Sequence, residues 1–336
     1  MNETRVARGG ETESVHRIRA VVAWDGRDRD TWVGEPGLST FWRSAMKPFQ
    51  ALPLVADGAA ASLGFGSEEI ALCCASHGGT PRHVEVARGM LDRLGLEETS
   101  LACGPHAPYD RTSAEDLRAS GRACSRIHNN CSGKHAGMLA LATARGWETT
   151  GYERPAHPVQ GRIRRELRDW IDADPDRLPW AVDGCGVPTP CLPLREMAIA
   201  MARLVSRARG GHEAAAAVVG AMTDHPELTS SPGRLPLWIM QAGAGRLLAK
   251  EGAEGVLCVA ATDTSWGLAL KVEDGSVRGV GPAAVETLCA LDLLRAEERD
   301  ALDDVRRVEL LNTRGERVGE IRASVGPVER RLAGGP

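Results

Sequence analysis

The sequence lacks any long uninterrupted run of apolar residues. A helix that spans a membrane needs about 18 or more such residues in a row, and no stretch of this chain approaches that length. The first residues, MNETRVARGGETES, also lack the apolar core of a signal peptide. We therefore expect a cytoplasmic protein with no membrane partner.

The chain also has little excess charge of either sign. Its 41 lysine and arginine residues stand against 45 aspartate and glutamate residues, which leaves a formal net charge of -4. So small a charge gives no general attraction to nucleic acid or to anionic lipid. We therefore expect a small-molecule substrate and no nucleic-acid partner.

No disulfide framework is visible. The nine cysteines are odd in number and show none of the compact spacings of a disulfide-rich scaffold. Reduced thiols are the expected state, most of them in the core.

Strand-like segments cluster near both ends of the chain. Residues 16–24 predict a strand that turns at Asp25-Gly26 and pairs with residues 38–42. Residues 255–261, 267–273 and 276–281 predict an antiparallel meander, with a hairpin at Asp274-Gly275. A last strand pair is expected around residues 314–315.

Helical spacing of apolar residues fills the region between them. It is found over residues 49–55, 67–74, 81–94, 134–145, 160–171, 194–207, 212–222, 235–249 and 282–296. Together these patterns predict an α/β protein of the α+β type, with a mixed, largely antiparallel sheet flanked by helices. Composition marks no internal boundary, so we expect one catalytic domain over residues 10–330, with 1–9 and 331–336 as flexible termini.

One candidate catalytic motif is S-x-x-K, formed by Ser44 and Lys47 where a strand should end and a helix begin. Residues three apart on a helix lie on one face, so hydroxyl and amine can touch. A lysine whose pKa is lowered by desolvation or by a second cation can act as the base that activates serine. The motif is the signature of serine β-lactamases, but four residues also match by chance.

A second serine and a second lysine lie in short glycine-containing motifs. Ser76 opens S-H-G-G, where glycines let the backbone approach a substrate closely. Lys250 opens K-E-G and loosely resembles the K-T-G element of penicillin-recognising enzymes. Taken singly, Ser76 fits an ordinary turn, and Lys250 fits a charge that stabilises the end of a helix.

Two cysteines in glycine-rich turns suggest a metal. Cys131 lies in N-N-C-S-G-K-H and Cys185 in D-G-C-G-V-P-T. Thiolates are good zinc ligands, and three protein ligands leave one position open. Ligand chemistry alone favours His135 as the third ligand, with two free thiols as the alternative; Asp183 could be a ligand, an orienting residue or a substrate contact.

Together these motifs resemble the rhizobial-type, or class 3, L-asparaginases, often called asparaginase II. The matching segments occur in the family's order and cover nearly the whole chain. They are E-S-V-H (13–16), R-S-A-M-K-P-F-Q-A-L-P-L (43–54), A-S-H-G-G (75–79), N-N-C-S-G-K-H-A-G-M-L (129–139), H-P-V-Q (157–160), D-G-C-G-V-P-T (183–189) and K-E-G-A-E-G-V (250–256). Residues 225–233, HPELTSSPG, depart from the family's pattern, which puts substrate preference in question.

The resemblance implies a fold similar to serine β-lactamases and serine glutaminases, and a homodimer. It implies two Ser-Lys pairs, Ser44 with Lys47 and Ser76 with Lys250. It also implies zinc held by Cys131, Lys134 and Cys185, which replaces His135 by Lys134 as the nitrogen ligand. Charge complementarity makes Arg43 and Asp183 candidates for binding the substrate's carboxylate and ammonium groups, and His135 is then a further substrate-binding candidate.

The expected activity is hydrolysis of L-asparagine to L-aspartate and ammonia through an acyl-enzyme. Ser44 would attack with Lys47 as base, while Ser76 and Lys250 relay protons, zinc orients the substrate, and no organic cofactor takes part. A glutaminase or broader ω-amidase is the nearest alternative, because one methylene changes binding by only ~1–3 kcal/mol. A non-catalytic amino-acid-binding protein and a penicillin hydrolase are the others, the latter without the S-D-N element.

Overall fold

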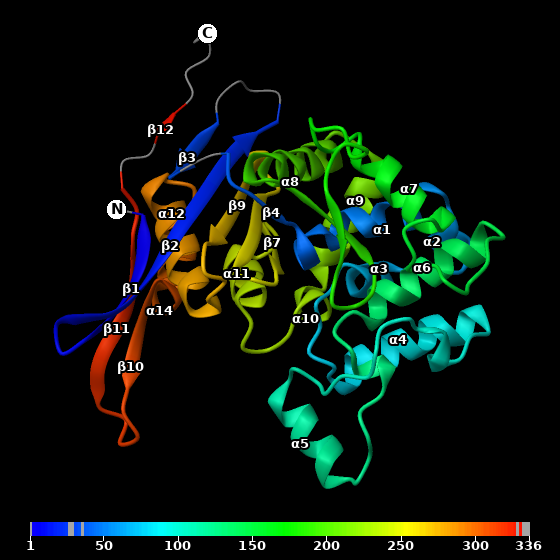
Figure 1. Ribbon diagram of the computed structural model, residues 1–336, viewed down its shortest axis with the longest axis horizontal. Coiled ribbons are helices and arrows are strands. Elements are labelled where there is room, and N and C mark those ends of the chain that lie inside the picture. Colours follow the sequence, from blue (N-terminus) through cyan, green and yellow to red (C-terminus); the bar gives the residue numbers. More distant parts are fainter. Residues whose placement is uncertain (1, 26–29, 35–36, 327–328, 331–336) are drawn as a thin grey trace. The chain divides into compact units, whose positions relative to one another are not determined.

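The computed structural model describes residues 2–25, 30–34, 37–326 and 329–330 (Figure 1). The chain divides into two compact units. Unit 1 comprises residues 1–45, 192–206 and 238–336, and unit 2 comprises residues 46–191 and 207–237. Helices and strands are mixed, and the predicted α+β class with an antiparallel sheet is confirmed. The single catalytic domain over residues 10–330 stays a prediction.

Unit 1 contains a large antiparallel sheet. Its strands follow the order β10-β11-β1-β2-β9-β8-β7, and β3 pairs with both β2 and β12. The bounds are β1 (Glu3–Arg8), β2 (Glu11–Trp24), β3 (Thr31–Val33), β7 (Leu247–Gly252), β8 (Val256–Ala261), β9 (Trp266–Val272), β10 (Arg307–Leu311), β11 (Arg317–Ser324) and β12 (Glu329–Arg330). A short strand, β4 (Ser39–Phe41), and a 3-10 turn, η1 (Arg43–Met46), end the first segment of this unit.

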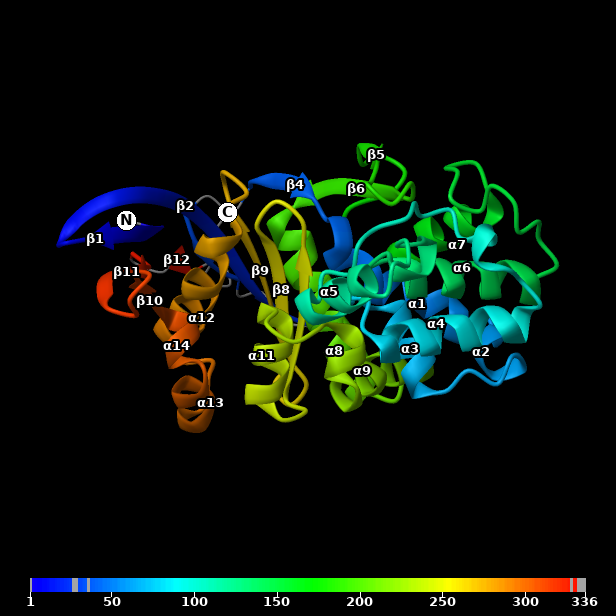
Figure 2. The same cartoon turned by 90° about the horizontal axis from the view of Figure 1, so that it is seen from below.

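Helices cover both faces of the central strands. Every residue of β8 and β9 is buried, which requires cover on each side. A Cβ atom on Gly267 would lie 2.2 Å from the carbonyl oxygen of Ala198 in α8 (Leu194–Arg209), so α8 packs directly on β9. Val272 points to the opposite face and contacts Gly279 of η4 (Val277–Gly279), which leads into α12 (Val280–Ala290). Figure 2 shows α8 and α12 on either side of β8 and β9.

The meander differs from its prediction in two places. Residues 276–281 form η4 and the start of α12 instead of a third strand, because Pro282 favours the first turn of a helix. The helix predicted over 235–249 ends earlier, as α11 (Leu235–Gly243), and Gly245 follows it with a φ of 89°. Lys250 therefore lies on β7, opposite Cys258 of β8, and not at a helix end.

The N-terminal residues also differ from the expectation of a flexible terminus. Residues 3–8 form β1, which hydrogen-bonds to β2 on one side and to β11 on the other. Val6 is buried, and two neighbouring strands satisfy the backbone groups of β1. Residues 331–336 lie outside the described residues.

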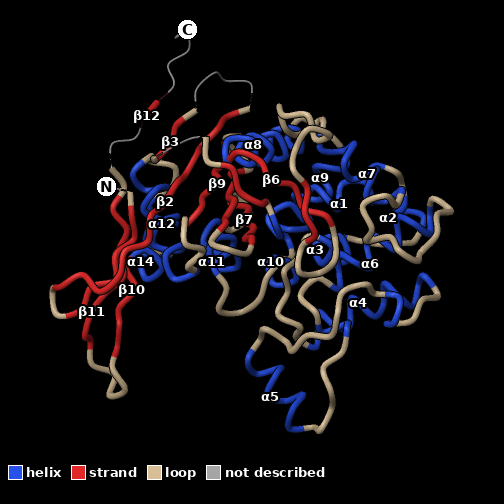
Figure 3. Tube along the Cα trace, in the orientation of Figure 1, coloured by secondary structure: helices blue, strands red, loops and turns tan. Residues whose placement is uncertain are grey.

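Unit 2 is mainly helical (Figure 3). Its helices are α1 (Lys47–Ala56), α2 (Ala59–Ser62), α3 (Ser67–Cys73), α4 (Pro81–Leu94), α5 (Arg111–Ala119), α6 (Ser132–Ala144), α7 (Pro158–Leu167), α9 (Glu213–Asp224) and α10 (Pro226–Thr229). Strands β5 (Trp180–Val182) and β6 (Pro188–Pro193) add an antiparallel hairpin. The predicted limits of α4 are confirmed: Thr80 caps it, and Gly95 ends it with a φ of 65°. No helix in the described part of the chain has the length and apolar character that a bilayer crossing requires.

Two glycines bring α6 close to α3. A Cβ atom on Gly133 would lie 2.5 Å from the carbonyl oxygen of Leu72, and one on Gly137 would lie 2.5 Å from the sulfur of Cys73. The helices can approach this closely only because neither glycine has a side chain. The close contact places the residues after α3, including Ser76, beside the start of α6.

A buried ion pair joins two segments of unit 1. Arg246, just before β7, donates to both carboxylate oxygens of Glu298 in α13 (Ala296–Ala301), at 2.7 and 2.6 Å. Glu298 is 2% exposed. Burial opposes ionisation, but the Arg246 hydrogen bonds and charge outweigh it and lower the pKa of Glu298.

We expect Glu298→Ala to lower the free energy of unfolding by about 3 kcal/mol, because it leaves the buried Arg246 guanidinium without its main partner. The loss should be full above the pH where an unfolded glutamate titrates, about 4.3, since a carboxylate with a lowered folded pKa stabilises only while ionised. It should shrink as pH falls through the folded pKa. Urea unfolding at several pH values measures it, with the exposed neighbour changed in Glu297→Ala as control; equal losses in both variants would contradict the prediction.

Candidate active site

Five predicted site residues form one buried cluster in unit 2. We call Lys47, Ser76, Cys131, Lys134 and Cys185 the thiol-lysine cluster; each is between 1% and 8% exposed. They come from α1, the segment after α3, the start of α6 and the β5-β6 hairpin. Ionisable groups buried this deeply must be paired, so their mutual contacts define the site.

Lys47 is the first residue of α1, one turn after Ser44 in η1. The predicted change to helix at this point is confirmed. Arg43, directly before Ser44, has a φ of 55°, which is uncommon for a residue with a side chain. Such a backbone costs on the order of 1–3 kcal/mol and is typical of functional turns.

Lys47 and Ser76 are in hydrogen-bond contact. The Nζ atom of Lys47 lies 3.0 Å from the Ser76 hydroxyl oxygen, 2.6 Å from the Ala75 carbonyl oxygen and 3.5 Å from the Asn130 carbonyl oxygen. A distance of 3.0 Å is within the range for proton transfer between a base and a hydroxyl. The structure therefore brings Ser76 together with Lys47, the lysine that the resemblance pairs with Ser44.

The backbone around Ser76 is fixed from two sides. The amide of Ser76 donates to the carbonyl of Thr229 at 3.2 Å, and the amide of His77 donates to that of Asn130 at 3.2 Å. Gly79 has a φ of 73°, and a Cβ atom there would lie 2.9 Å from the carbonyl oxygen of His128. Residues 225–233, which depart from the family's pattern, thus bond directly to the segment that carries Ser76.

The start of α6 and the β5-β6 hairpin bring the thiols together. Cys131 occupies the position directly before α6, and Lys134 follows one turn later on the same face. Cys185 lies in the tight turn of the hairpin, where the amide of Asp183 donates to Val187 at 2.9 Å. The Lys134 amine then donates to the Cys185 sulfur at 2.8 Å.

The two thiols are hydrogen-bonded to each other, and their pKa values shift in opposite directions. A hydrogen bond from Cys185, helped by the charges of Lys47 and Lys134, lowers the pKa of Cys131 well below its usual value. The same contact and burial raise the pKa of Cys185. Burial alone would lower the pKa of Lys134, but the charges on Cys185 and Cys131 raise it instead. The cluster thus favours the ionised form of Cys131, with Lys47 and Lys134 as the nearby positive charges.

His135 is held by a residue that the sequence analysis missed. Its Nδ1 atom lies 2.6 Å from the hydroxyl of Tyr152, which accepts a hydrogen bond from the amide of Ala102 at 2.8 Å. Burial lowers the pKa of His135 to about 4, although the nearby Cys185 sulfur opposes this shift. The imidazole is therefore neutral at pH 7. Nothing in the spacing around Tyr152 indicates this contact.

A second buried histidine supports the Ser76 segment. His77 accepts from the amide of Gly79 at 3.1 Å on one ring nitrogen, and its other nitrogen lies 2.9 Å from the hydroxyl of Ser132. Burial, and then the charge of His83, lower the pKa of His77 well below its usual value. His77 is therefore a neutral structural residue that links this segment to α6.

Three predicted residues belong to unit 1. Arg43 and Ser44 lie in η1, and Lys250 lies on β7, where it is 1% exposed and donates to the carbonyl of Glu251 at 2.9 Å. Their joint action with the thiol-lysine cluster stays a prediction.

Comparison with known families agrees with these motifs. The family model for L-asparaginase II matches residues 4–323 of the 336. The chain belongs to the L-asparaginase II family. The matched span contains every predicted site residue, and membership supports an amidohydrolase of the asparaginase type. A search of the curated proteins found no match.

The family's expected metal ligands have suitable chemistry here. Among the described residues, no group of three or more histidine, cysteine, aspartate or glutamate side chains is arranged to hold a metal. Cys131, Cys185 and His135 therefore do not form such a group by themselves. Lysine is not one of those residue types. Two hydrogen-bonded thiols and an amine 2.8 Å from one of them offer two sulfur donors and one nitrogen, which suits zinc.

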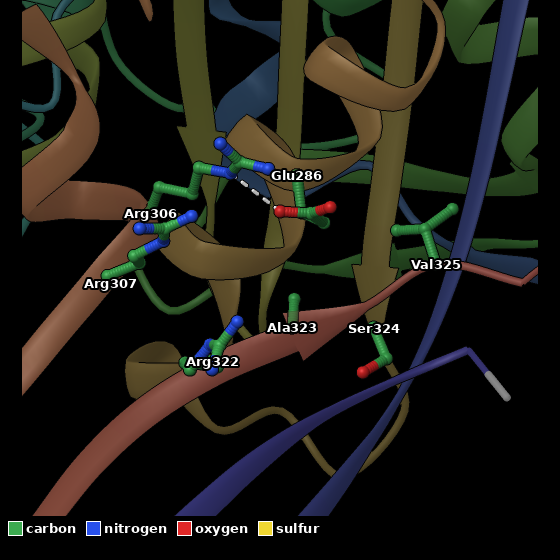
Figure 4. A pocket seen from close by; sticks show the side chains of 7 residues that line it. All are labelled: Glu286, Arg306, Arg307, Arg322, Ala323, Ser324 and Val325. Carbon is green, nitrogen blue, oxygen red and sulfur yellow. Dashed lines mark hydrogen bonds and ion pairs between the residues drawn. The ribbon is translucent and has the colours of Figure 1, made fainter. Parts of the chain in front are cut away.

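A pocket in unit 1 contains none of these residues. It has a volume of about 280 Å³, and its walls are Glu286, Arg306, Arg307, Arg322, Ala323, Ser324 and Val325 (Figure 4). Arg306 and Glu286 form an ion pair of 2.7 Å across it. No predicted nucleophile or base lines this pocket, so the candidate site of this asparaginase-family chain is the thiol-lysine cluster.

Proposed function

We propose that the protein hydrolyses the side-chain amide of L-asparagine to give L-aspartate and ammonia. The observation that supports this most directly is the 3.0 Å contact between Lys47 and Ser76 in a buried cluster. Acyl transfer requires a nucleophile and a base close to each other, and a serine and an amine at this distance meet that requirement. The chain also belongs to a family of asparaginases.

Ser44 is the proposed nucleophile. It is half-buried and follows the strained residue Arg43. Ser76 is only 4% exposed, and its hydroxyl is hydrogen-bonded to Lys47, so it is less accessible to a substrate. The Ser44 oxygen bonds to the amide carbon while its proton passes to neutral Lys47, directly or through Ser76. The carbon–nitrogen bond then breaks, the nitrogen takes that proton and leaves as ammonia, and water hydrolyses the ester to aspartate. The resemblance assigns Lys250 to the same proton relay.

The charged ends of the substrate need complementary groups. Arg43 suits the α-carboxylate and Asp183 suits the α-ammonium group, both by charge alone. Asp183 lies two residues before Cys185 in the hairpin turn, and its charge acts on Lys134. His135 is a third candidate contact.

We propose zinc as the metal, with Cys131, Lys134 and Cys185 as the residues that would hold it. When bound, zinc would orient the substrate and would not generate hydroxide. The residues must change protonation to bind it, because both thiols and the Lys134 amine have to be deprotonated. We also propose a homodimer on the basis of the resemblance, and a cytoplasmic location because the nine cysteines are free thiols.

A glutaminase or broader ω-amidase is the second candidate. The observation that favours it is the hydrogen bond between Ser76 and Thr229, because Thr229 belongs to the segment that departs from the family's pattern. A different backbone path in residues 225–233 would change the space that is available to a substrate beside Ser76.

Ammonia release from asparagine and from glutamine tests the proposal. We expect kcat/KM for asparagine to exceed that for glutamine at least about tenfold, since one methylene costs ~1–3 kcal/mol in a fitted pocket. Equal rates with both amides would favour the ω-amidase. Tight binding of asparagine without turnover would favour a binding protein, and turnover of a chromogenic β-lactam would favour a penicillin hydrolase.

A further inference from the structure

Tyr152 is the middle member of a short chain of hydrogen bonds that links the amide of Ala102 to His135. Its hydroxyl accepts from the amide of Ala102 at 2.8 Å and contacts Nδ1 of His135 at 2.6 Å. The residue is 1% exposed, and its carbonyl accepts from the side chain of Gln160 at 2.8 Å. The ring is therefore fixed from both ends.

Counting donors and acceptors assigns the proton in this chain. The amide of Ala102 must donate, so the Tyr152 hydroxyl accepts there and keeps its own proton for another partner. Burial raises the pKa of Tyr152, so the phenol stays protonated. The described neighbour able to accept its proton is Nδ1 of His135. In a neutral imidazole the other nitrogen, Nε2, then carries the hydrogen.

The Nε2 atom of His135 is buried without a partner of ordinary hydrogen-bond geometry among the described residues. The Cys185 sulfur makes a weak hydrogen bond with His135 that raises the pKa of the imidazole, but the same sulfur also receives a hydrogen bond from Lys134 at 2.8 Å. A poorly satisfied buried donor is costly, and within the described part of the chain Nε2 has only this shared sulfur as an acceptor, so an oxygen atom of a bound substrate would satisfy it better.

We infer that Tyr152 is a positioning residue that holds His135 as the Nε2–H tautomer, so that His135 presents a hydrogen-bond donor to a substrate oxygen and is not a metal ligand. The part of this inference that concerns substrate rests on the proposed function. The tautomer does not, because it follows from the contacts of Tyr152 alone. An imidazole nitrogen that carries a hydrogen has no lone pair for a metal.

NMR of the nitrogen-15-labelled imidazole groups tests the tautomer in the purified full chain. His135→Gln identifies the His135 signals, which we expect to show the Nε2–H form in the wild type. Tyr152→Phe keeps the ring but removes the hydroxyl, so it should lose this pure signature. The chain has one other tyrosine, Tyr109, which is 48% exposed, and Tyr109→Phe is the matched control that should leave His135 unchanged. An Nδ1–H form in the wild type would overturn the inference.

Kinetics and zinc content test the role. His135→Ala should raise KM for asparagine about ten- to hundredfold with a smaller change in kcat, the loss expected for a hydrogen bond to a charged group. Tyr152→Phe should raise KM less, because the imidazole is still present but is no longer held in one tautomer. His135→Gln, which retains a donor, should keep a lower KM than His135→Ala, and both should keep their zinc. Loss of zinc in His135→Ala would make His135 a ligand and overturn the inference. If the wild type does not turn over asparagine, the proposed function fails, while the NMR result still decides the tautomer.

Discussion

Lys47→Met is expected to lower kcat for asparagine by about 10³-fold or more, because general-base catalysis typically supplies 10²–10⁴ of the rate. Both serines depend on this amine in the proposed mechanism. Steady-state kinetics with asparagine measures the loss. Circular dichroism and thermal unfolding show whether the variant is folded.

Lys271→Met is the matched control. Lys271 is also buried, at 8% exposed, and its amine donates to the carbonyl of Glu273 at 3.2 Å. It lies on β9, outside the thiol-lysine cluster. Both substitutions remove one buried amine and keep the length of the side chain, so a general effect of losing a buried amine would lower kcat in both variants. Comparable losses would show that Lys47 has no special part in catalysis.

Substitution of the two serines distinguishes the nucleophile from the residue that relays its proton. Ser44→Ala and Ser76→Ala should each remove most of kcat, and the loss in the double variant should fall well short of the product of the single losses, because a nucleophile and its base act together. Mass spectrometry of rapidly quenched enzyme should find the acyl group on the peptide that contains Ser44. An acyl group on Ser76, with turnover near the wild-type rate in Ser44→Ala, would assign the nucleophile to Ser76.

Local patterns predicted the elements that carry the site. The change from strand to helix near Ser44 follows from residue spacing, and the helix predicted over residues 81–94 has the same limits as α4. These signals succeed because they depend on neighbours in the chain. The contact of Lys47 with Ser76 spans 29 positions and depends on how α1, α3 and α6 pack, which no local pattern contains.

Lys250 shows how tertiary pairing overrides a local pattern. The helix predicted over 235–249 ends just before this residue, but β8 is available as a partner, and residues 247–252 pair with it as β7. Tyr152 is the opposite case, because it has no local signal at all. Its role comes from a buried donor and acceptor 50 and 17 positions away.

Zinc content provides the last test, because Cys185→Ser should reduce the metal from about one zinc per chain to none. A hydroxyl does not replace a thiolate as a ligand for zinc, and the hairpin turn offers no second sulfur. Cys131→Ser and Lys134→Ala should lose the metal as well. Cys289→Ser, which changes a half-buried thiol in α12 of unit 1, is the control that should keep it.

Elemental analysis of protein purified without added metal measures this content, and ammonia assays on the same samples relate it to activity. His135→Ala should keep its zinc, because His135 is not a ligand in this assignment. Its Nδ1 lone pair accepts the Tyr152 hydroxyl proton in a hydrogen bond, so it is not free to bind a metal. Zinc lost in His135→Ala but kept in Lys134→Ala would make His135 the nitrogen ligand, as ligand chemistry alone suggests. A wild-type enzyme that is fully active without metal would leave Cys131 and Cys185 as a structural thiol pair, since the hydrogen bond between them satisfies both sulfurs in the absence of a cation.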